Sequence, residues 1–302
     1  MFDPTLDRKD SDYSHLSTCE VHKSRLPLLE KYVIVKQLYK ADIGNTTVSI
    51  AKKVTDLAET AERYILKEID LKFLTTDDYV NQSRAEFLIQ KEMNHENIVQ
   101  CIEYEEKDNF IRSILEIVNE PEYLQVQLDD NMEPISDEFM LKTFITEMLD
   151  AVIHMHKKNI VHCDIKIENI LGHATSDQSF PSLKLCDFGL ARRVDPITQL
   201  VYIEKKMGTR EYMAPEIKDK SHISMKVDVW SLGLVFYKMC TTYLPNQLSR
   251  DWIAMGQPLP MRDADWVGRP DELKDLIGKM LVVDPAVRIS AQEALEHPYL
   301  SI

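Results

Sequence analysis

The chain has 302 residues, a hydrophobic fraction of 44% and a net charge of −14 at pH 7. This length suits one large or two medium domains, and the acidic balance disfavours nonspecific binding to nucleic acid. The five cysteines lack metal or redox spacing, and neither a signal peptide nor a membrane-spanning apolar run is found. We therefore expect an intracellular protein, cytoplasmic or nuclear, with no membrane segment.

The first half of the chain is predicted to be rich in strands. Residues 1–28 are polar and aperiodic, which predicts an N-terminal extension. Residues 32–35 and 46–50 are rich in β-branched residues and indicate two strands, joined by a hairpin with a single glycine, Gly44. Residues 63–69 and 110–118 indicate two further strands.

Two helices are predicted from caps and periodicity. The first begins after Thr76 as N-cap and extends to about residue 94. The second begins after Ser136, and its apolar residues recur at three- and four-residue steps, which is typical of a helix that packs on a core. These apolar residues are Leu141, Phe144, Ile145, Met148, Leu149, Val152 and Met155.

Residues 162–169, which read His-Cys-Asp-Ile-Lys-Ile-Glu-Asn, carry the strongest chemical signal. If this stretch is a loop, the carboxylate of Asp164 and the carboxamide of Asn169 can converge, and Lys166 adds a cation. A base, a cation and a metal-binding amide are what phosphoryl transfer requires. The motifs Asp-Phe-Gly at 187–189 and Met-Ala-Pro-Glu at 213–216 strengthen this interpretation.

Together these motifs resemble those of the eukaryotic protein kinase family, serine/threonine type, from about Tyr32 to Leu300. The resemblance implies one kinase domain over residues 29–302 with a bilobal α+β fold. A small antiparallel sheet with one key helix would form the N-lobe, about 29–118, and a mainly helical C-lobe would span about 119–302. It also implies transfer of the γ-phosphate of ATP to Ser or Thr of a protein substrate, with Mg²⁺, or alternatively Mn²⁺, as the ion.

The resemblance implies roles for the polar residues. Asp164 would act as base or orienter for the substrate hydroxyl, and Lys166 would neutralise the phosphate in transfer. Asn169 and Asp187 would hold the metal ions. The other residues expected to bind the nucleotide are Gly44, Val48, Ile65, Lys67, Glu86, Glu116, Val118 and Leu171, with Glu86 as the ion-pair partner of Lys67.

Several further residues are expected to support the site. Thr209 would bridge Asp164 and Lys166, and Asp228 would hold the backbone of the catalytic loop. Glu216 would pair with Arg288. His162 and Phe188 would pack beneath the loop.

Four departures from the family pattern carry expectations of their own. Only Gly44 remains in the normally glycine-rich turn, which predicts weaker nucleotide binding. Ile65 would narrow the adenine slot, and a polar Gln90 beneath the site predicts a loosened active conformation. A separate expectation, which involves no departure from the pattern, is that Cys186, next to Asp187, is the thiol most open to electrophiles.

The fourth departure is Cys163, which stands where many kinases have a phosphate-binding arginine. Phosphorylation of the segment at Thr198 or Tyr202 is therefore expected to contribute little. Control would come instead from expression, from the N-terminal extension or from a regulatory protein that orders the helix bearing Glu86. The alternative is that other cations bind such a phosphate, namely Arg192, Arg193, Lys205 and Lys206.

Two rival functions remain at this point. A pseudokinase, acting as a nucleotide-binding scaffold, is favoured by Ile65, Gln90 and the sparse glycines, and is opposed by the intact Lys67 and Asp187. A small-molecule kinase is disfavoured because the Gly-Thr and Ala-Pro-Glu platform is a docking surface that small substrates do not need.

Overall fold

The computed structural model describes residues 27–40, 46–74, 76–119, 134–174, 179–245 and 266–301. Two expectations lie outside these ranges: the loop with Gly44, at residues 41–45, and nearly all of the polar extension, at residues 1–26. Within the described ranges, no helix combines the length and the apolar content needed to cross a membrane.

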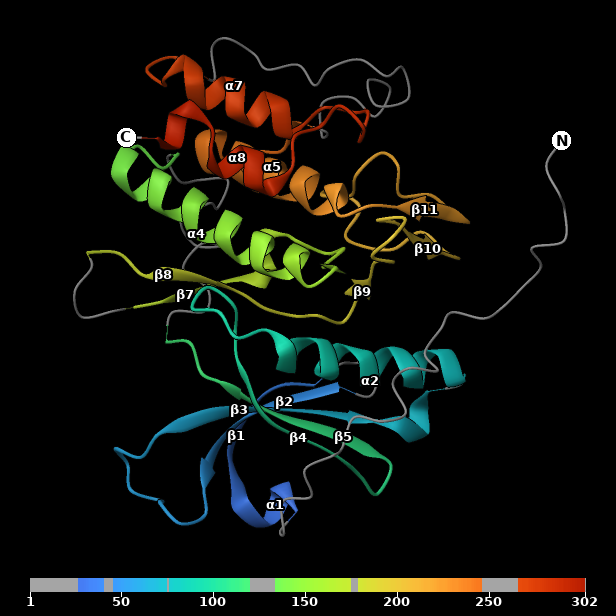
Figure 1. Cartoon of the computed structure of the whole chain (residues 1–302). Coiled ribbons are helices and arrows are strands. Elements are labelled where there is room, and N and C mark those ends of the chain that lie inside the picture. The colour runs from blue at the N-terminus through green and yellow to red at the C-terminus, as the bar shows by residue number, and fades with distance from the viewer. Residues whose placement is uncertain are drawn as a thin grey trace, which may run out of the picture.

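The smaller lobe is built on a five-stranded antiparallel sheet, seen at the bottom of Figure 1. Its strands are β1 (Tyr32–Lys40), β2 (Thr46–Lys53), β3 (Arg63–Asp70), β4 (Cys101–Lys107) and β5 (Phe110–Glu116). Their spatial order is β1-β2-β3-β5-β4, so β3 is central. The four predicted strands are confirmed, and β4 has no counterpart in the prediction. Cross-strand pairing extends β1 and β2 beyond the β-branched runs that indicated them.

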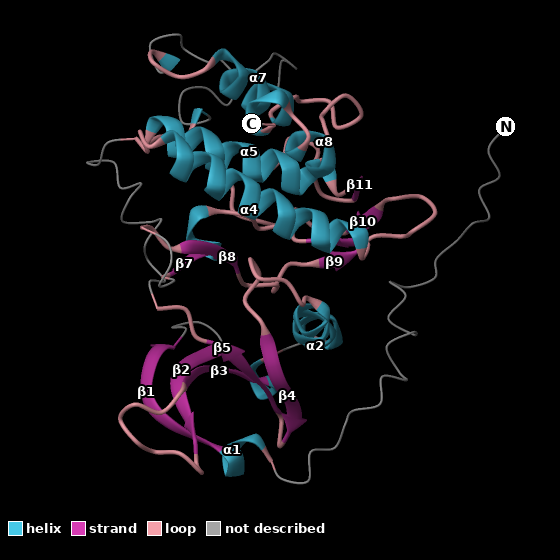
Figure 2. Ribbon diagram, turned by 60° about the vertical axis from the view of Figure 1, so that its left-hand side comes forward, coloured by secondary structure: helices cyan, strands magenta, loops and turns pink. Residues whose placement is uncertain are grey.

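Helix α2 (Asp77–Glu92) lies between this sheet and the larger lobe, as Figure 2 shows with the helix seen nearly end-on. The side chain of Thr76 accepts a hydrogen bond from the N–H of Tyr79 at 3.4 Å, so the predicted cap is confirmed. Phe87 is fully buried in a cluster with Ile69 of β3 and Ile111 of β5. This apolar contact fixes the helix on the sheet at the turn that carries Glu86.

The larger lobe is mainly helical and encloses one extended apolar core. Its helices are α4 (Glu138–Lys157), α5 (Lys226–Thr241), α7 (Asp271–Met280) and α8 (Ala291–Leu295). All seven residues of the predicted apolar stripe are buried on α4. The predicted N-cap is wrong by one residue: Asp137, not Ser136, accepts a hydrogen bond from the N–H of Met140 at 2.9 Å. A carboxylate at this position also favours the positive end of the helix dipole.

The remaining elements are short. They are α1 (Leu28–Lys31), η2 (Leu71–Phe73), η3 (Ile167–Asn169), η6 (Pro298–Leu300), β6 (Ile160–Val161), β7 (Ile170–His173), β8 (Ser182–Leu185), β9 (Arg192–Arg193), β10 (Val201–Ile203) and β11 (Ser221–Ile223). Three two-stranded sheets form from the pairs β6–β9, β7–β8 and β10–β11. The predicted bilobal α+β architecture is confirmed. The catalytic loop follows β6 and leads into β7, and β7, β8 and β9 lie on the side of the larger lobe nearest α2 (Figure 1).

Candidate active site

The catalytic loop is anchored from below by one buried carboxylate. Asp228, in the first turn of α5, accepts hydrogen bonds from the backbone N–H groups of His162 and Cys163, both at 2.9 Å. It also lies 3.0 Å from Nε2 of His156 on α4. Cys163 has a φ of 67°, a left-handed conformation that costs energy for a residue with a side chain. Charge-assisted hydrogen bonds to Asp228 offset that cost, and the predicted supporting role of Asp228 is confirmed.

Asp164 lies at the centre of a hydrogen-bonded group. Its Oδ1 accepts from the N–H of Thr209 at 2.8 Å and from the Thr209 hydroxyl at 2.7 Å. Lys166 Nζ lies 3.1 Å from Oδ2 of Asp164 and donates to the Thr209 hydroxyl at 2.8 Å. Asn169 donates from Nδ2 to the backbone carbonyl of Asp164 at 2.9 Å. The predicted bridge through Thr209 is confirmed, and four of the predicted polar residues converge on one point.

Lys67 joins α2 to the Asp-Phe-Gly segment. Its Nζ lies 2.5 Å from Glu86 and 3.3 Å from Asp187. Burial alone would lower the pKa of Lys67, but the carboxylates of Glu86 and Asp187 outweigh it, and the pKa is raised above its ordinary value. The charge of Lys67 is in turn the main reason why the pKa of Asp187 is lowered. Lys67 is therefore a cation and Asp187 an anion at neutral pH. As expected, Glu86 contacts Lys67, whereas Glu92, near the end of α2, pairs with Arg193.

The Asp-Phe-Gly segment is held in place on both sides. Phe188 is fully buried, and its ring centroid lies 5.0 Å from that of His162. His162 Nε2 lies 3.2 Å from the carbonyl oxygen of Cys186. On the other side, the side chain of Gln82 on α2 donates to the carbonyl of Gly189 at 2.8 Å. The expected packing roles of His162 and Phe188 agree with this geometry.

Apolar residues expected at the adenine position lie in one cluster. Leu115 and Val118 are buried together with Val99 and Cys101, and the partly buried Ile65, Leu171 and Cys186 pack against them. Val48 is the ladder partner of Lys67 and therefore lies on the same face of the sheet. The N–H of Glu116 donates to the carbonyl of Gln100 at 3.0 Å, so this N–H is not available to a base.

The hydrogen bonding of Gln90 removes the reason for expecting a loosened active conformation. Gln90 is 2% exposed, and its Nε2 donates to the carbonyl of Val99 at 3.0 Å. A buried amide that is hydrogen-bonded to the backbone stabilises its surroundings and is costly only when left without a partner. Gln90 therefore ties α2 to the chain that enters β4.

The structure also argues against Cys186 as a reactive thiol. Burial and the neighbouring Asp187 raise the pKa of Cys186 to about 12. Because the thiolate is the nucleophile, few molecules carry it at neutral pH. Cys101 and Cys240 are more buried still, and burial raises their pKa values likewise.

Two contacts of α2 were absent from the sequence prediction. Gln82 lies one helical turn before Glu86, so helix periodicity places both side chains on one face and was a usable signal. The ion pair of Glu92 with Arg193 of β9, at 2.5 Å, links α2 to the segment after Gly189. Nothing in the local sequence indicates this second contact, because its partners are far apart in the chain.

No group of three or more His, Cys, Asp or Glu suited to a metal ion occurs in the described ranges. The predicted ligand pair, Asp187 and Asn169, contains one carboxylate and one amide oxygen. This donor set suits Mg²⁺, which keeps several waters and shares its coordination sphere with substrate phosphates. The side chain of Asp187 is 48% exposed, so its carboxylate is open to such an ion.

Comparisons with known proteins agree with this geometry. A family model described as protein kinase domain matches residues 39–300. The chain is 32% identical over 266 residues to human serine/threonine-protein kinase DCLK3, a match covering 85% of this chain and 39% of that protein. It is 31% identical over 284 residues to the probable serine/threonine-protein kinase fhkE of Dictyostelium discoideum, covering 90% and 38%. It is 30% identical over 279 residues to serine/threonine-protein kinase cds1 of Schizosaccharomyces pombe, covering 85% and 56%. The chain thus spans less than two thirds of each of these relatives.

Proposed function

The chain belongs to the protein kinase family, and we propose that it is an active enzyme that transfers the γ-phosphate of ATP to Ser or Thr of protein substrates. The observation that carries this proposal is the contact of Lys67 with both Glu86 at 2.5 Å and Asp187 at 3.3 Å. Phosphoryl transfer in protein kinases requires this lysine–glutamate pair and the metal-binding aspartate together. The printed names of the relatives support Ser and Thr as acceptors.

In this proposal Asp164 orients the acceptor hydroxyl and accepts its proton. Two donors lie near Oδ2 of Asp164: Lys166 Nζ at 3.1 Å and Asn169 Nδ2 at 3.3 Å. Because the contact with Asn169 is the longer of the two, the hydroxyl of the substrate can replace it. Lys166 lies next to the same oxygen and is placed to neutralise charge on the phosphate. Holding the acceptor in line and supplying fixed positive charge are the main contributions a protein makes to this reaction.

Asp187 and Asn169 would hold Mg²⁺. When bound, this ion neutralises charge on the phosphates of ATP. Lys67 contributes a second fixed positive charge at the same place, and its pair with Glu86 makes that contribution depend on the position of α2. The side chains of Ile65, Leu115 and Leu171 would contact the adenine from an apolar cluster.

The second candidate is a nucleotide-binding scaffold without transfer activity. It is favoured by Ile65, which packs in the cluster expected to receive adenine and leaves less room than a smaller residue would. Incubation of the purified chain with γ-labelled ATP, Mg²⁺ and a peptide library distinguishes the two candidates. Label on Ser or Thr of the peptides supports the enzyme, and ATP binding in calorimetry without any label supports the scaffold.

We predict that activity does not depend on phosphorylation of Thr198 or Tyr202. Thr198 is bonded to the carboxylate of Asp195 through both its N–H, at 2.7 Å, and its hydroxyl, at 3.0 Å. Tyr202 donates to Glu204 at 2.9 Å. Cys163 is buried and offers a neutral thiol in place of a cation. Both hydroxyls are thus already bonded within the segment, and Arg193, one of the cations expected to bind such a phosphate, is paired with Glu92.

Thr198→Ala, Tyr202→Phe and phosphatase-treated protein should each keep most of the peptide-kinase rate of untreated protein. Mass spectrometry of the starting material establishes whether either site carries phosphate. A loss of about tenfold, corresponding to about 1.4 kcal/mol of transition-state stabilisation, would show that the segment is gated by phosphate.

A further inference from the structure

The segment before and after Thr209 lies directly against the catalytic loop. Thr209 contacts Asp164 through two hydrogen bonds of 2.8 and 2.7 Å. Gly208 has a φ of 101°, and a Cβ at this residue would lie only 2.7 Å from the carbonyl oxygen of Cys163. Consecutive Cα atoms are about 3.8 Å apart, so Lys206 and Arg210 lie within a few residue lengths of Asp164. A peptide that presents a hydroxyl to Asp164 would therefore lie near these two residues.

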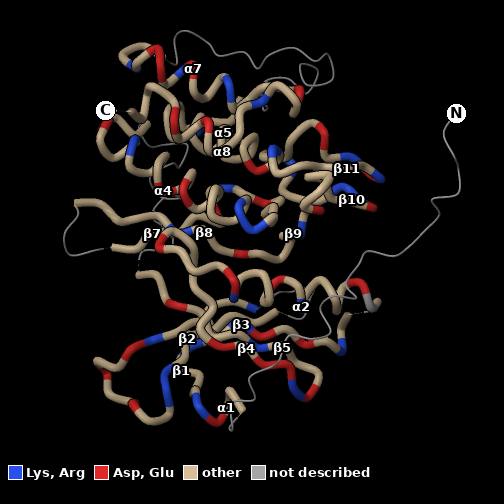
Figure 3. Tube along the Cα trace, viewed as in Figure 1, with Lys and Arg blue, Asp and Glu red and all other residues tan. Residues whose placement is uncertain are grey.

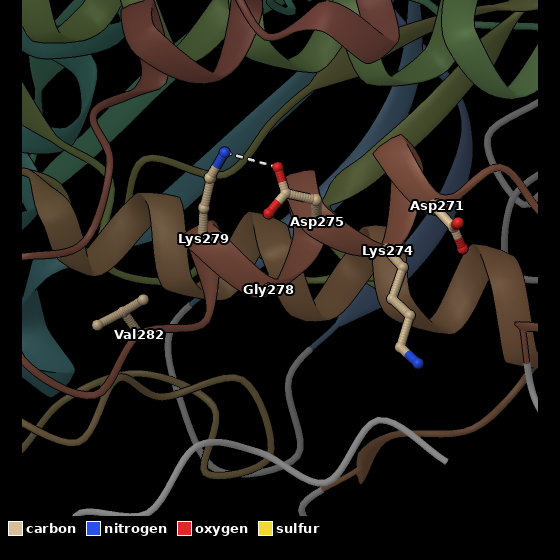
Figure 4. Close-up of a pocket in the computed structure, with 6 residues that line it drawn as sticks. All are labelled: Asp271, Lys274, Asp275, Gly278, Lys279 and Val282. Carbon is tan, nitrogen blue, oxygen red and sulfur yellow. Dashed lines mark hydrogen bonds and ion pairs between the residues drawn. The ribbon is translucent and has the colours of Figure 1, made fainter. Parts of the chain in front are cut away.

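Lys206 and Arg210 are exposed, and neither side chain has a carboxylate partner in the part of the chain that the structure describes. Several other cations on the surface are paired with carboxylates. On α7, Lys279 lies 2.6 Å from Asp275, a pair drawn in Figure 4. Arg84 lies 2.6 Å from Glu106 on β4. Within the described ranges, Lys206 and Arg210 therefore lack a carboxylate partner although the chain as a whole has a net charge of −14. They are available to bind an anionic group of a substrate.

The neighbouring acidic residues do not remove this positive charge. Asp219 accepts a hydrogen bond from the backbone N–H of Lys206, not from its side chain. Glu204 lies 3.9 Å from Lys220. Figure 3 shows Lys and Arg segments on the chain around β10 and β11, which flank this region. Lys205 adds a further exposed cation next to Lys206.

Two carboxylates limit the extent of the positive charge around Lys206 and Arg210. Glu168 and Glu211 both lie close enough to Tyr212 to raise the pKa of its hydroxyl, after burial, which is the main cause. Since charges at a protein surface are screened beyond about 8 Å, the effect of Lys206 is local. The chain is therefore expected to prefer peptides with an anionic residue on one side of the acceptor Ser or Thr, within a few residues of it.

We propose that the substrates of this chain carry anionic residues, aspartate, glutamate or a phosphorylated residue, on one side of the acceptor Ser or Thr, and that Lys206 and Arg210 recognise them. This inference rests on the proposed kinase function and specifies its substrate class. Arginine pairs with carboxylate and phosphate through two parallel hydrogen bonds, whereas lysine contributes a point charge. Phosphate, with its larger charge, should be preferred to a carboxylate.

The test compares peptides that share one acceptor serine and differ in its flanking residues. One series places Asp or Glu at each position in turn, a second places phosphoserine there, and a third places Lys. For the wild-type chain, kcat/KM is expected to be higher by about tenfold for the best acidic peptide than for its Lys counterpart, as two modest charge contacts would provide. Phosphoserine should raise it further.

The Lys206→Glu/Arg210→Glu variant should lose this preference, mainly through a higher KM. Lys107→Glu, an exposed change of the same sign at the end of β4, is the control and should keep this preference. An equal kcat/KM for acidic and Lys peptides in the wild type would refute the inference while the kinase function stands.

If no peptide is phosphorylated, the kinase function fails, and the inference is then decided by binding. Fluorescence anisotropy of a labelled acidic peptide should show binding that weakens at high salt and in Lys206→Glu/Arg210→Glu. Equal binding of acidic and Lys peptides would refute it independently of catalysis.

Discussion

Asp164→Asn is expected to lower kcat by about 10²–10⁴-fold, the range for loss of a positioned acid–base group. Asparagine retains an oxygen that can accept from Thr209, so the bonds at 2.8 and 2.7 Å can persist. What is lost is the negative charge next to Lys166, now 3.1 Å away, and the acceptor for the proton of the substrate hydroxyl. KM for ATP should change little, because Asp164 faces the acceptor and not the nucleotide cluster around Leu115.

Steady-state kinetics with labelled ATP and a peptide substrate provides the measurement, and circular dichroism verifies that the variant folds. Asp271→Asn is a matched control, because it removes the same charge from an exposed position at the start of α7 (Figure 4). Unchanged kcat in Asp164→Asn would mean that the transfer occurs elsewhere or comes from a contaminating kinase. Lys67→Met and Asp187→Asn should also abolish transfer, because Lys67→Met removes a phosphate contact and Asp187→Asn removes a metal ligand.

The catalytic loop could be predicted from the sequence because its chemistry is local. Asp164, Lys166 and Asn169 lie within six consecutive residues, so any loop brings them together. Asp228 and Glu216 were also predictable, since motifs with fixed offsets identify them. As expected, Asp228 accepts a hydrogen bond from the backbone N–H of His162 at 2.9 Å, and Glu216 pairs with Arg288 at 2.7 Å.

The consequences of Gln90 could not be predicted in the same way. A polar residue at an apolar position indicates disruption only if its hydrogen-bonding groups stay unsatisfied. Whether a partner exists depends on the path of a distant strand, here the carbonyl of Val99 at 3.0 Å. The same limit applies to Glu92 and Arg193, whose contact depends on how the lobes meet. Such contacts are tertiary, and neither periodicity nor motif spacing contains them.

Element ends were the other weak point of the sequence prediction. The choice between Ser136 and Asp137 as N-cap depends on a one-residue shift, and both are good caps. The strand β4, Cys101–Lys107, contains one β-branched residue, Ile102, and four of its seven residues are charged. It forms because it pairs with β5 along nearly its whole length, which is a property of the sheet and not of the segment.

Arg288→Ala is expected to lower the free energy of unfolding by about 3–5 kcal/mol, the usual cost of breaking a buried ion pair. The Arg288 side chain is fully buried and contacts Glu216 through two bonds, at 2.7 and 3.0 Å. It also donates to the carbonyls of Val282 at 2.9 Å and Lys226 at 2.7 Å. Alanine would leave these acceptors without donors and remove a cation–π contact with Trp230, whose ring centroid lies 5.0 Å from Arg288 Cζ.

Thermal denaturation followed by circular dichroism is the measurement, and the loss should lower Tm by about 10 °C in a chain of this size. Arg84→Ala is the control: Arg84 pairs with Glu106 at 2.6 Å at the surface, where such pairs contribute about 0–1 kcal/mol. Glu216→Gln should cost less than Arg288→Ala, because glutamine keeps an oxygen for the guanidinium and leaves the carbonyl contacts of Arg288 in place. Equal Tm values for Arg288→Ala and Arg84→Ala would show that the ion pair between Glu216 and the loop joining α7 and α8 does not stabilise the fold.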